Sequence, residues 1–334
     1  MKMFLYRLLR FRGYVQRFYA DYNLYLVMAA KTVTALAVLL GINAAFPYRP
    51  VLGRGLIVAA VSILCSILPW NYITIFGLLF LLGQLSALSI EAALFVLVLA
   101  VSLAVLSYVT LPGGSILWAV LPLLIAWKIP LAGVLLAGLF GGVTRFVSVG
   151  SGTVIYYVLK LIADHADLLS GAQTVAADGS EVGTLVQRLL LLVKGFLNNE
   201  EMIIVLIVFS LTTLLVHFLS RTEVDYARVI AILTGAFFCP VLMMAALHHA
   251  ELDLSVGGMM LSAFLGLLIS LLVYFFAEGL DYTKTEKVQF EDDEYYYYVK
   301  AVPKIRLPGN DMKADPGKVQ QRLKTAAGEK EKGR

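Results

Sequence analysis

The sequence predicts an all-α polytopic membrane protein with about eight transmembrane helices, a re-entrant helix pair and a short cytoplasmic β-hairpin in the tail. Of the 334 residues, 60% are hydrophobic and 15% are charged, whereas soluble domains carry about 25% charged residues. Residues 56–142 contain two formally charged side chains, Glu91 and Lys128. At about 20 apolar residues per crossing, this stretch has room for several helices. Frequent charges return in residues 278–334.

Residues 1–23 are expected to form an amphipathic interfacial helix, because apolar and basic side chains alternate there. The basic residues are Lys2, Arg7, Arg10, Arg12 and Arg17. We expect this helix to lie on the cytoplasmic leaflet, with its arginines near anionic headgroups. The alternative is a flank that only sets orientation. In either case the basic residues place this end in the cytoplasm.

Apolar segments predict an N-terminal membrane bundle at 24–163 and a C-terminal one at 202–277. The predicted spans are 24–46, 52–69, 72–88, 92–111, 147–163, 202–220, 227–247 and 254–276. The connection 221–228 carries two arginines, whereas 248–253 carries no lysine or arginine. The first is therefore expected inside and the second outside. With both chain ends in the cytoplasm, the number of crossings must be even.

Residues 115–142 are predicted to form the re-entrant pair. Segments 115–127 and 129–142 are each too short to cross comfortably, and Pro122 and Pro130 interrupt them. Short, proline- and glycine-broken apolar segments are typical of re-entrant half-helices. One long kinked helix is an alternative, and ten spans would result if each short half crossed alone.

Residues 164–201 are expected to form an extracytoplasmic loop, because the chain turns polar there. Within the loop, Leu185, Leu189 and Leu192 recur at helical spacing between residues 184 and 197. We therefore expect an amphipathic helix that lies at the membrane surface.

The tail is predicted to contain a cytoplasmic, tyrosine-rich hairpin at 278–308, followed by a disordered segment at 309–334. Four consecutive tyrosines place rings on both faces of a strand. One face can pack locally while the other contacts a cytoplasmic protein partner. The predicted docking residues are Phe290, Glu291, Asp292, Asp293, Glu294, Tyr295, Tyr296, Tyr297 and Tyr298. The alternative is a self-contained hairpin that shields the tail.

Ionisable residues within the apolar part are candidates for a transport role. They are Lys31, Glu91, Lys128 and His217. The alternative for Lys31 is a side chain that reaches toward the membrane interface.

Two groups of acidic and histidine residues lie in expected outer loops and suit a divalent metal ion such as zinc. The candidate ligands are His165, Asp167, His248, His249 and Glu251, beside Asp164 and Asp253. The alternative is that these are ordinary interfacial loop residues.

The sequence contains no Walker A, HExxH or GxSxG motif. The glycine run 150–152 has no lysine after it and no preceding strand, so it predicts close helix packing instead of nucleotide binding. We therefore expect no enzymatic activity, no cofactor and no nucleic-acid partner. The expected partners are the lipid bilayer, a cytoplasmic protein and either a second copy of the chain or an ATPase subunit.

The string VQFEDDEYYYYVKAVPKI at Val288–Ile305 resembles the tail of a group of bacterial polytopic membrane proteins often labelled ABC transporter permeases. The resemblance implies a bacterial cytoplasmic membrane protein with this organisation and carries no established activity. An importer-type coupling loop would follow Glu91-Ala92-Ala93, but Leu97 stands where that pattern has glycine. The first functional hypothesis is thus a non-enzymatic membrane subunit of a bacterial envelope assembly. The alternative is a transporter permease, with or without a separate ATPase subunit.

Overall fold

The computed structural model describes residues 2–110, 116–170, 181–224, 226–250, 256–277, 286–291 and 296–301. The chain divides into two compact units. Unit 1 comprises Met1–Asp21 and Tyr274–Arg334, and unit 2 comprises Tyr22–Val273. The last turn of one long apolar helix therefore belongs to unit 1, and the rest of that helix belongs to unit 2.

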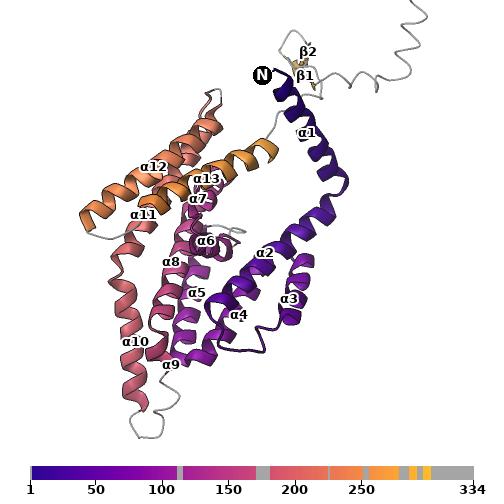
Figure 1. The fold of residues 1–334 in the computed structure, drawn as a ribbon. Coiled ribbons are helices and arrows are strands. Elements are labelled where there is room, and N and C mark those ends of the chain that lie inside the picture. The colour runs from indigo at the N-terminus through magenta and orange to yellow at the C-terminus, as the bar shows by residue number, and fades with distance from the viewer. Residues whose placement is uncertain are drawn as a thin grey trace, which may run out of the picture. The chain divides into compact units, whose positions relative to one another are not determined.

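Helices make up most of the described chain (Figure 1). They are α1 (Lys2–Asp21), α2 (Asn23–Ala45), α3 (Gly55–Ile67), α4 (Asn71–Leu88), α5 (Ile90–Thr110), α6 (Ile116–Ala126), α7 (Pro130–Phe140), α8 (Arg145–Asp164), α9 (Ala166–Ser170), α10 (Glu181–Leu197), α11 (Glu200–Ser220), α12 (Ala227–Ala250) and α13 (Val256–Ala277). The strands are β1 (Glu286–Glu291) and β2 (Tyr296–Ala301).

Six helices of the described residues are long and apolar enough to cross a membrane: α2, α4, α8, α11, α12 and α13. Their apolar stretches run from 18 to 23 residues, and about 20 residues cross the roughly 30 Å hydrocarbon core of a bilayer. The lengths and compositions of these helices indicate an α-helical, multi-pass membrane protein, which agrees with the predicted fold class.

The predicted spans at 52–69 and 92–111 correspond to α3 and α5. Helix α3 has 13 residues and is about 20 Å long, because hydrogen-bonded turns take up the residues before it. In those turns the Leu52 and Gly53 amides donate to the Arg49 carbonyl. Helix α3 is thus shorter than the span expected at 52–69. Helix α5 has 21 residues, and the total of eight spans remains a prediction.

One hydrophobic core of unit 2 joins elements that lie far apart in the sequence. Leu85 of α4, Ile162 of α8 and Leu192 of α10 are all 0% exposed and belong to this core. Phe46, directly after α2, and Ala92 of α5 are buried with them. The core therefore packs α10 against the long apolar helices. Helix α10 corresponds in sequence to the amphipathic helix expected at 184–197.

Helix α7 is buried along most of its length, with eight of its 11 residues in the interior. Two glycines, one on α7 and one on α13, allow this close packing. A Cβ atom on Gly138 would lie 2.7 Å from the Thr213 carbonyl oxygen of α11, and one on Gly266 of α13 would lie 2.9 Å from the Ala132 amide nitrogen. Small residues at such contacts let helix backbones approach closely.

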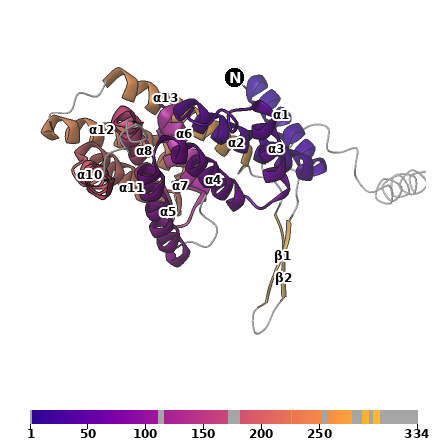
Figure 2. The ribbon, with the colours of Figure 1, turned by 90° about the horizontal axis from the view of Figure 1, so that it is seen from below.

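In unit 1, β1 and β2 pair antiparallel, and Figure 2 shows them side by side. The register places Val288 opposite Val299 and Phe290 opposite Tyr297. The connecting residues 292–295 lie outside the described residues, as does the segment 309–334 for which disorder was predicted. The two strands thus contain five of the nine residues proposed for docking.

Candidate functional site

Two short apolar helices, α6 and α7, follow one another in unit 2. Each has 11 residues and extends about 16 Å, roughly half of the hydrocarbon core. Lys128, in the connection between them, has a positive φ of 61°, and Pro130 begins α7. Gly133 lies against Leu121 and Leu124, so the first turn of α7 packs against the end of α6. The structure describes two separate helices here, and the re-entrant arrangement remains a prediction.

A cavity of about 800 Å³ lies beside α6, between α2, α4, α5 and α8. This volume lies in the range of small-molecule sites, roughly 300–1,000 Å³. Most of the lining is apolar, with small side chains such as Ala100 of α5 and Ala119 of α6. Trp118 of α6 also lines the cavity. Its indole N–H is buried and has no hydrogen-bond partner among the described residues.

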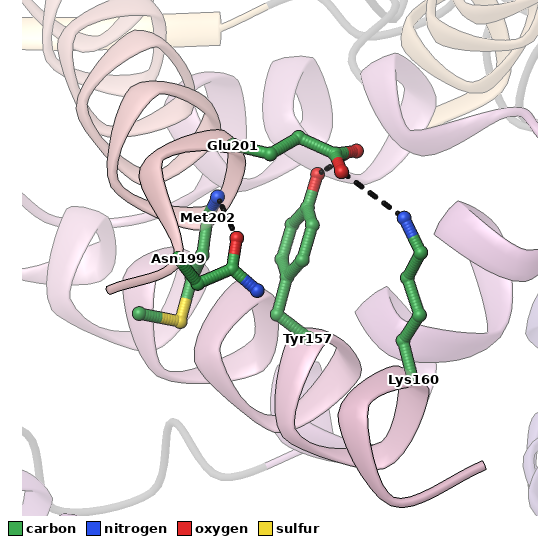
Figure 3. Close-up of polar contacts among 5 residues, drawn as sticks. All are labelled: Tyr157, Lys160, Asn199, Glu201 and Met202. Atoms are coloured by element: carbon green, nitrogen blue, oxygen red, sulfur yellow. Dashed lines mark hydrogen bonds and ion pairs between the residues drawn. The ribbon is translucent and has the colours of Figure 1, made fainter. Parts of the chain in front are cut away.

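The polar part of the cavity wall includes Lys160, near the end of α8. Its Nζ lies 3.1 Å from Oε2 of Glu201 in the first turn of α11, and the Tyr157 hydroxyl donates to Oε1 of the same carboxylate at 3.0 Å (Figure 3). Asn199 caps α11, because its Oδ1 accepts from the Met202 amide at 2.9 Å. The cluster therefore ties the end of α8 to the start of α11.

A second ion pair joins the amphipathic helix α10 to α5. Nη1 of Arg188 lies 3.3 Å from Oε1 of Glu91. The Phe95 and Phe196 rings meet edge to face beside it, with centroids 6.2 Å apart. Glu91, a predicted transport candidate, therefore forms a buried contact between helices.

A buried amide network holds the connection between α2 and α3 against α4. Gln84 is 0% exposed. Its Oε1 accepts from the Arg49 amide at 2.7 Å, and its Nε2 donates to Oδ1 of Asn43 at 2.6 Å. Nearby, burial raises the pKa of Tyr48, and the charge of Asp167 raises it further.

The other transport candidates occupy separate places in unit 2. Lys31 of α2 donates from Nζ to the Leu68 carbonyl at 2.9 Å, just beyond the end of α3. A cation at this place stabilises the helix, because the C-terminal end of a helix carries partial negative charge. Lys128 is exposed. His217 of α11 is 7% exposed, and its Nδ1 has no partner among the described residues. The structure does not bring these residues together with Glu91 in any contact of the described part.

The metal candidates do not form a cluster in the described part of the chain, where no three His, Cys, Asp or Glu side chains come together. The ring Nδ1 of His165 instead lies 2.9 Å from the Leu161 carbonyl oxygen, and Asp167 lies in the first turn of the short helix α9. The side chains of His248 and His249 lie outside the described residues, as does all of Glu251. The metal site remains a prediction.

The docking candidates are placed through their backbone. Phe290 and Glu291 lie in β1, and Tyr296, Tyr297 and Tyr298 lie in β2. Asp292, Asp293, Glu294 and Tyr295 fall outside the described residues. The docking role therefore remains a prediction.

Sequence reasoning missed Lys160, Glu201, Arg188 and Gln84. Each lies within or beside a segment that was assigned as a whole, so no single residue stood out. A usable signal was present, because Tyr157 and Lys160 are one turn apart near a span end and polar side chains there need partners.

No protein-family model, curated protein or solved structure matches this chain.

Proposed function

We propose that the chain is a non-enzymatic, permease-type protein of the bacterial cytoplasmic membrane that takes an apolar or amphiphilic molecule into unit 2. The observation that carries this proposal is the cavity of about 800 Å³ beside α6. Apolar side chains from five helices line it, so the part of the ligand that enters it must be largely apolar.

The half-length helices support transport over simple anchoring. Discontinuous helices are a recurring feature of transporter binding sites, because broken helices leave backbone groups and movable joints at membrane depth. Here α6 borders the cavity and contains Pro122 within the helix. Helix α7 is buried against α11. Movement of α6 against a fixed α7 would change access to the cavity.

The proposal is tested by photolabelling the full chain in proteoliposomes with a diazirine-bearing fatty acid. Labelling of cavity-lining peptides in α5 and α6 should saturate and should be competed by unlabelled fatty acid. Ala100→Phe places a ring in the cavity and should lower this saturable labelling. Ala100 is 9% exposed and lines the cavity.

Val98→Phe is the matched control on the same helix, because Val98 is 58% exposed. It is two residues from Ala100 and therefore lies on a different face of the helix. This variant should label like the wild type. Non-saturable labelling, or equal labelling of both variants, would contradict a binding cavity. Probe transport into the liposomes then separates a permease from a protein that only binds.

The second candidate is the membrane subunit of an envelope assembly, with the tyrosine-rich tail as its docking segment. The pairing of β1 with β2 favours it, because a two-stranded sheet presents strand edges that a partner can extend. The test compares affinity purification of the full chain with a variant in which Tyr296, Tyr297 and Tyr298 become serine. A specific protein should be lost from the variant, and unchanged recovery would argue against docking.

We further propose that both chain ends lie in the cytoplasm. The support is the basic N-terminal segment and the lysines and arginines of the tail, together with the arginines of 221–228. A reporter fused after Arg334 should be active in the cytoplasm, whereas activity on the outer side would overturn this orientation.

A further inference from the structure

Unit 1 contains a buried arginine with an unused hydrogen-bonding edge. Arg12 of α1 is 7% exposed, and its guanidinium carbon lies 5.3 Å from the centroid of the Phe275 ring. Its Nε and Nη2 atoms are buried and have no hydrogen-bond partner among the described residues. These two nitrogens form one edge of the planar guanidinium, so their N–H bonds point in the same direction. That edge matches two oxygens of a phosphate or carboxylate.

The edge formed by Nε and Nη2, which has no hydrogen-bond partner in the described part of unit 1, favours an anion for energetic reasons. Arginine stays charged in proteins, and a buried charge without a partner is strongly unfavourable. The face of Phe275 offsets part of this penalty through a cation–π contact but takes none of the N–H groups. Gln16, one turn after Arg12, uses its Nε2 on the Phe276 carbonyl at 3.5 Å.

The contacts of α1 place this arginine at the end of a candidate membrane span. Phe11 packs edge to face on Phe276, with ring centroids 6.3 Å apart, and Phe276 is the next-to-last residue of the span Gly257–Ala277. Arg12 is therefore at the depth where a bilayer changes from hydrocarbon to headgroups. The oxyanion present at that depth is the phosphate of a phospholipid.

The remaining surface of α1 suits the same environment. The helix has five basic residues and one acidic residue. Arg10 and Arg17, seven residues apart and thus on one face, are exposed, as are the rings of Phe11 and Tyr14. Exposed aromatic and basic side chains on one helix are typical of a helix that binds an anionic membrane surface.

We propose that Arg12 holds the phosphate of an anionic phospholipid, with Nε and Nη2 each donating to one phosphate oxygen. Phe275 supports the plane of the guanidinium, and the exposed Arg10 and Arg17 add attraction to neighbouring headgroups. Because the two nitrogens are covered in the described arrangement, the Arg12 side chain must shift across Phe275 to admit the phosphate. The site thereby links the lipid to the contact between α1 and the end of α13.

The test measures thermal stabilisation of the detergent-purified full chain by short-chain phosphatidylglycerol. Arg12→Gln and Arg12→Lys should both weaken the apparent affinity about tenfold, the value of one charge-assisted hydrogen bond. Lysine keeps the charge but lacks the two-nitrogen edge. Arg10→Gln, at an exposed position on the same helix, is the control and should change the affinity much less.

Two further probes separate the sources of phosphate. Short-chain phosphatidylcholine has a phosphate but no net charge and should bind more weakly. Inorganic phosphate at the same concentration should give no comparable shift. Equal stabilisation by inorganic phosphate would overturn the lipid assignment, and equal losses in the Arg12 and Arg10 variants would overturn the role of Arg12.

A measurement on the unaltered chain covers the case in which both Arg12 variants misfold. Wild-type protein labelled with ¹⁵N-arginine is placed in phosphatidylglycerol liposomes, and ¹⁵N–³¹P dipolar dephasing is recorded. One immobile guanidinium signal should be dephased at both its Nε and Nη resonances. The absence of any such immobile, dephased signal would overturn the proposal.

Discussion

Arg188 of α10 pairs with Glu91 of α5 across 97 positions of sequence, with Nη1 3.3 Å from Oε1. The Glu91 side chain is 4% exposed and the Arg188 side chain 21% exposed. The pair adds a charged contact to the apolar packing of α10 in unit 2, where Leu192 is buried in the core. Because the two side chains differ in burial, replacing one should lower the stability more than replacing the other.

Arg188→Gln should lower stability more than Glu91→Gln. The first variant leaves a buried carboxylate without its cation, which destabilises by about 3–5 kcal/mol. The second leaves the more exposed guanidinium, which water can reach. Thermal unfolding in detergent measures the stability of both variants. The double variant should unfold at a higher temperature than Arg188→Gln. A double variant whose loss of stability equals the sum of the two single losses would show that the residues act independently.

Lys160→Gln should have a much smaller effect on stability than Arg188→Gln. Lys160 also pairs with a glutamate, Glu201, but its side chain is 42% exposed. Ion pairs open to solvent contribute at most about 1 kcal/mol. The same unfolding measurement checks this prediction. A loss as large as that of Arg188→Gln would mean that Lys160 and Glu201 form a buried pair in the membrane.

Gln84→Leu should destabilise the connection between α2 and α3. The replacement leaves the Arg49 amide and the Asn43 side-chain oxygen without the partners they have now. Both lost hydrogen bonds are partly buried, so each contributes about 1 kcal/mol. Hydrogen exchange at residues 47–54 should accelerate, while exchange in α11 should stay unchanged. Uniform acceleration in both regions would indicate global unfolding instead.

Gly138→Ala should destabilise the packing of α7 on α11. The added Cβ atom would lie 2.7 Å from the Thr213 carbonyl oxygen and 2.9 Å from Cβ of Val216. Overpacking of this kind costs about 1–3 kcal/mol. Gly142→Ala is the matched control, because an added Cβ there meets nothing within 4 Å. Equal unfolding temperatures for the two variants would show that the helices separate easily.

Local composition was enough to predict the membrane character of the chain. Each of the six long helices is a predominantly apolar stretch, and such a stretch is helical in lipid because every backbone group must be satisfied within the segment. The broken region at 115–142 was also readable, since Pro130 and the short segments around Lys128 are local signals. The length of α3 could not be predicted from the sequence, because turns involving Arg49 shorten the helix.

The pairing of charged and polar residues was decided by tertiary structure alone. Glu91 was noticed in the sequence as an ion within an apolar stretch, but its partner Arg188 lies 97 residues away. Lys160 and Glu201 are 41 residues apart, and the cavity takes its wall from five separate helices. Hydropathy is a property of neighbouring residues and therefore reports the solvent around a segment. The partner of a buried charge depends on which helices pack together, and the sequence of one segment does not contain that information.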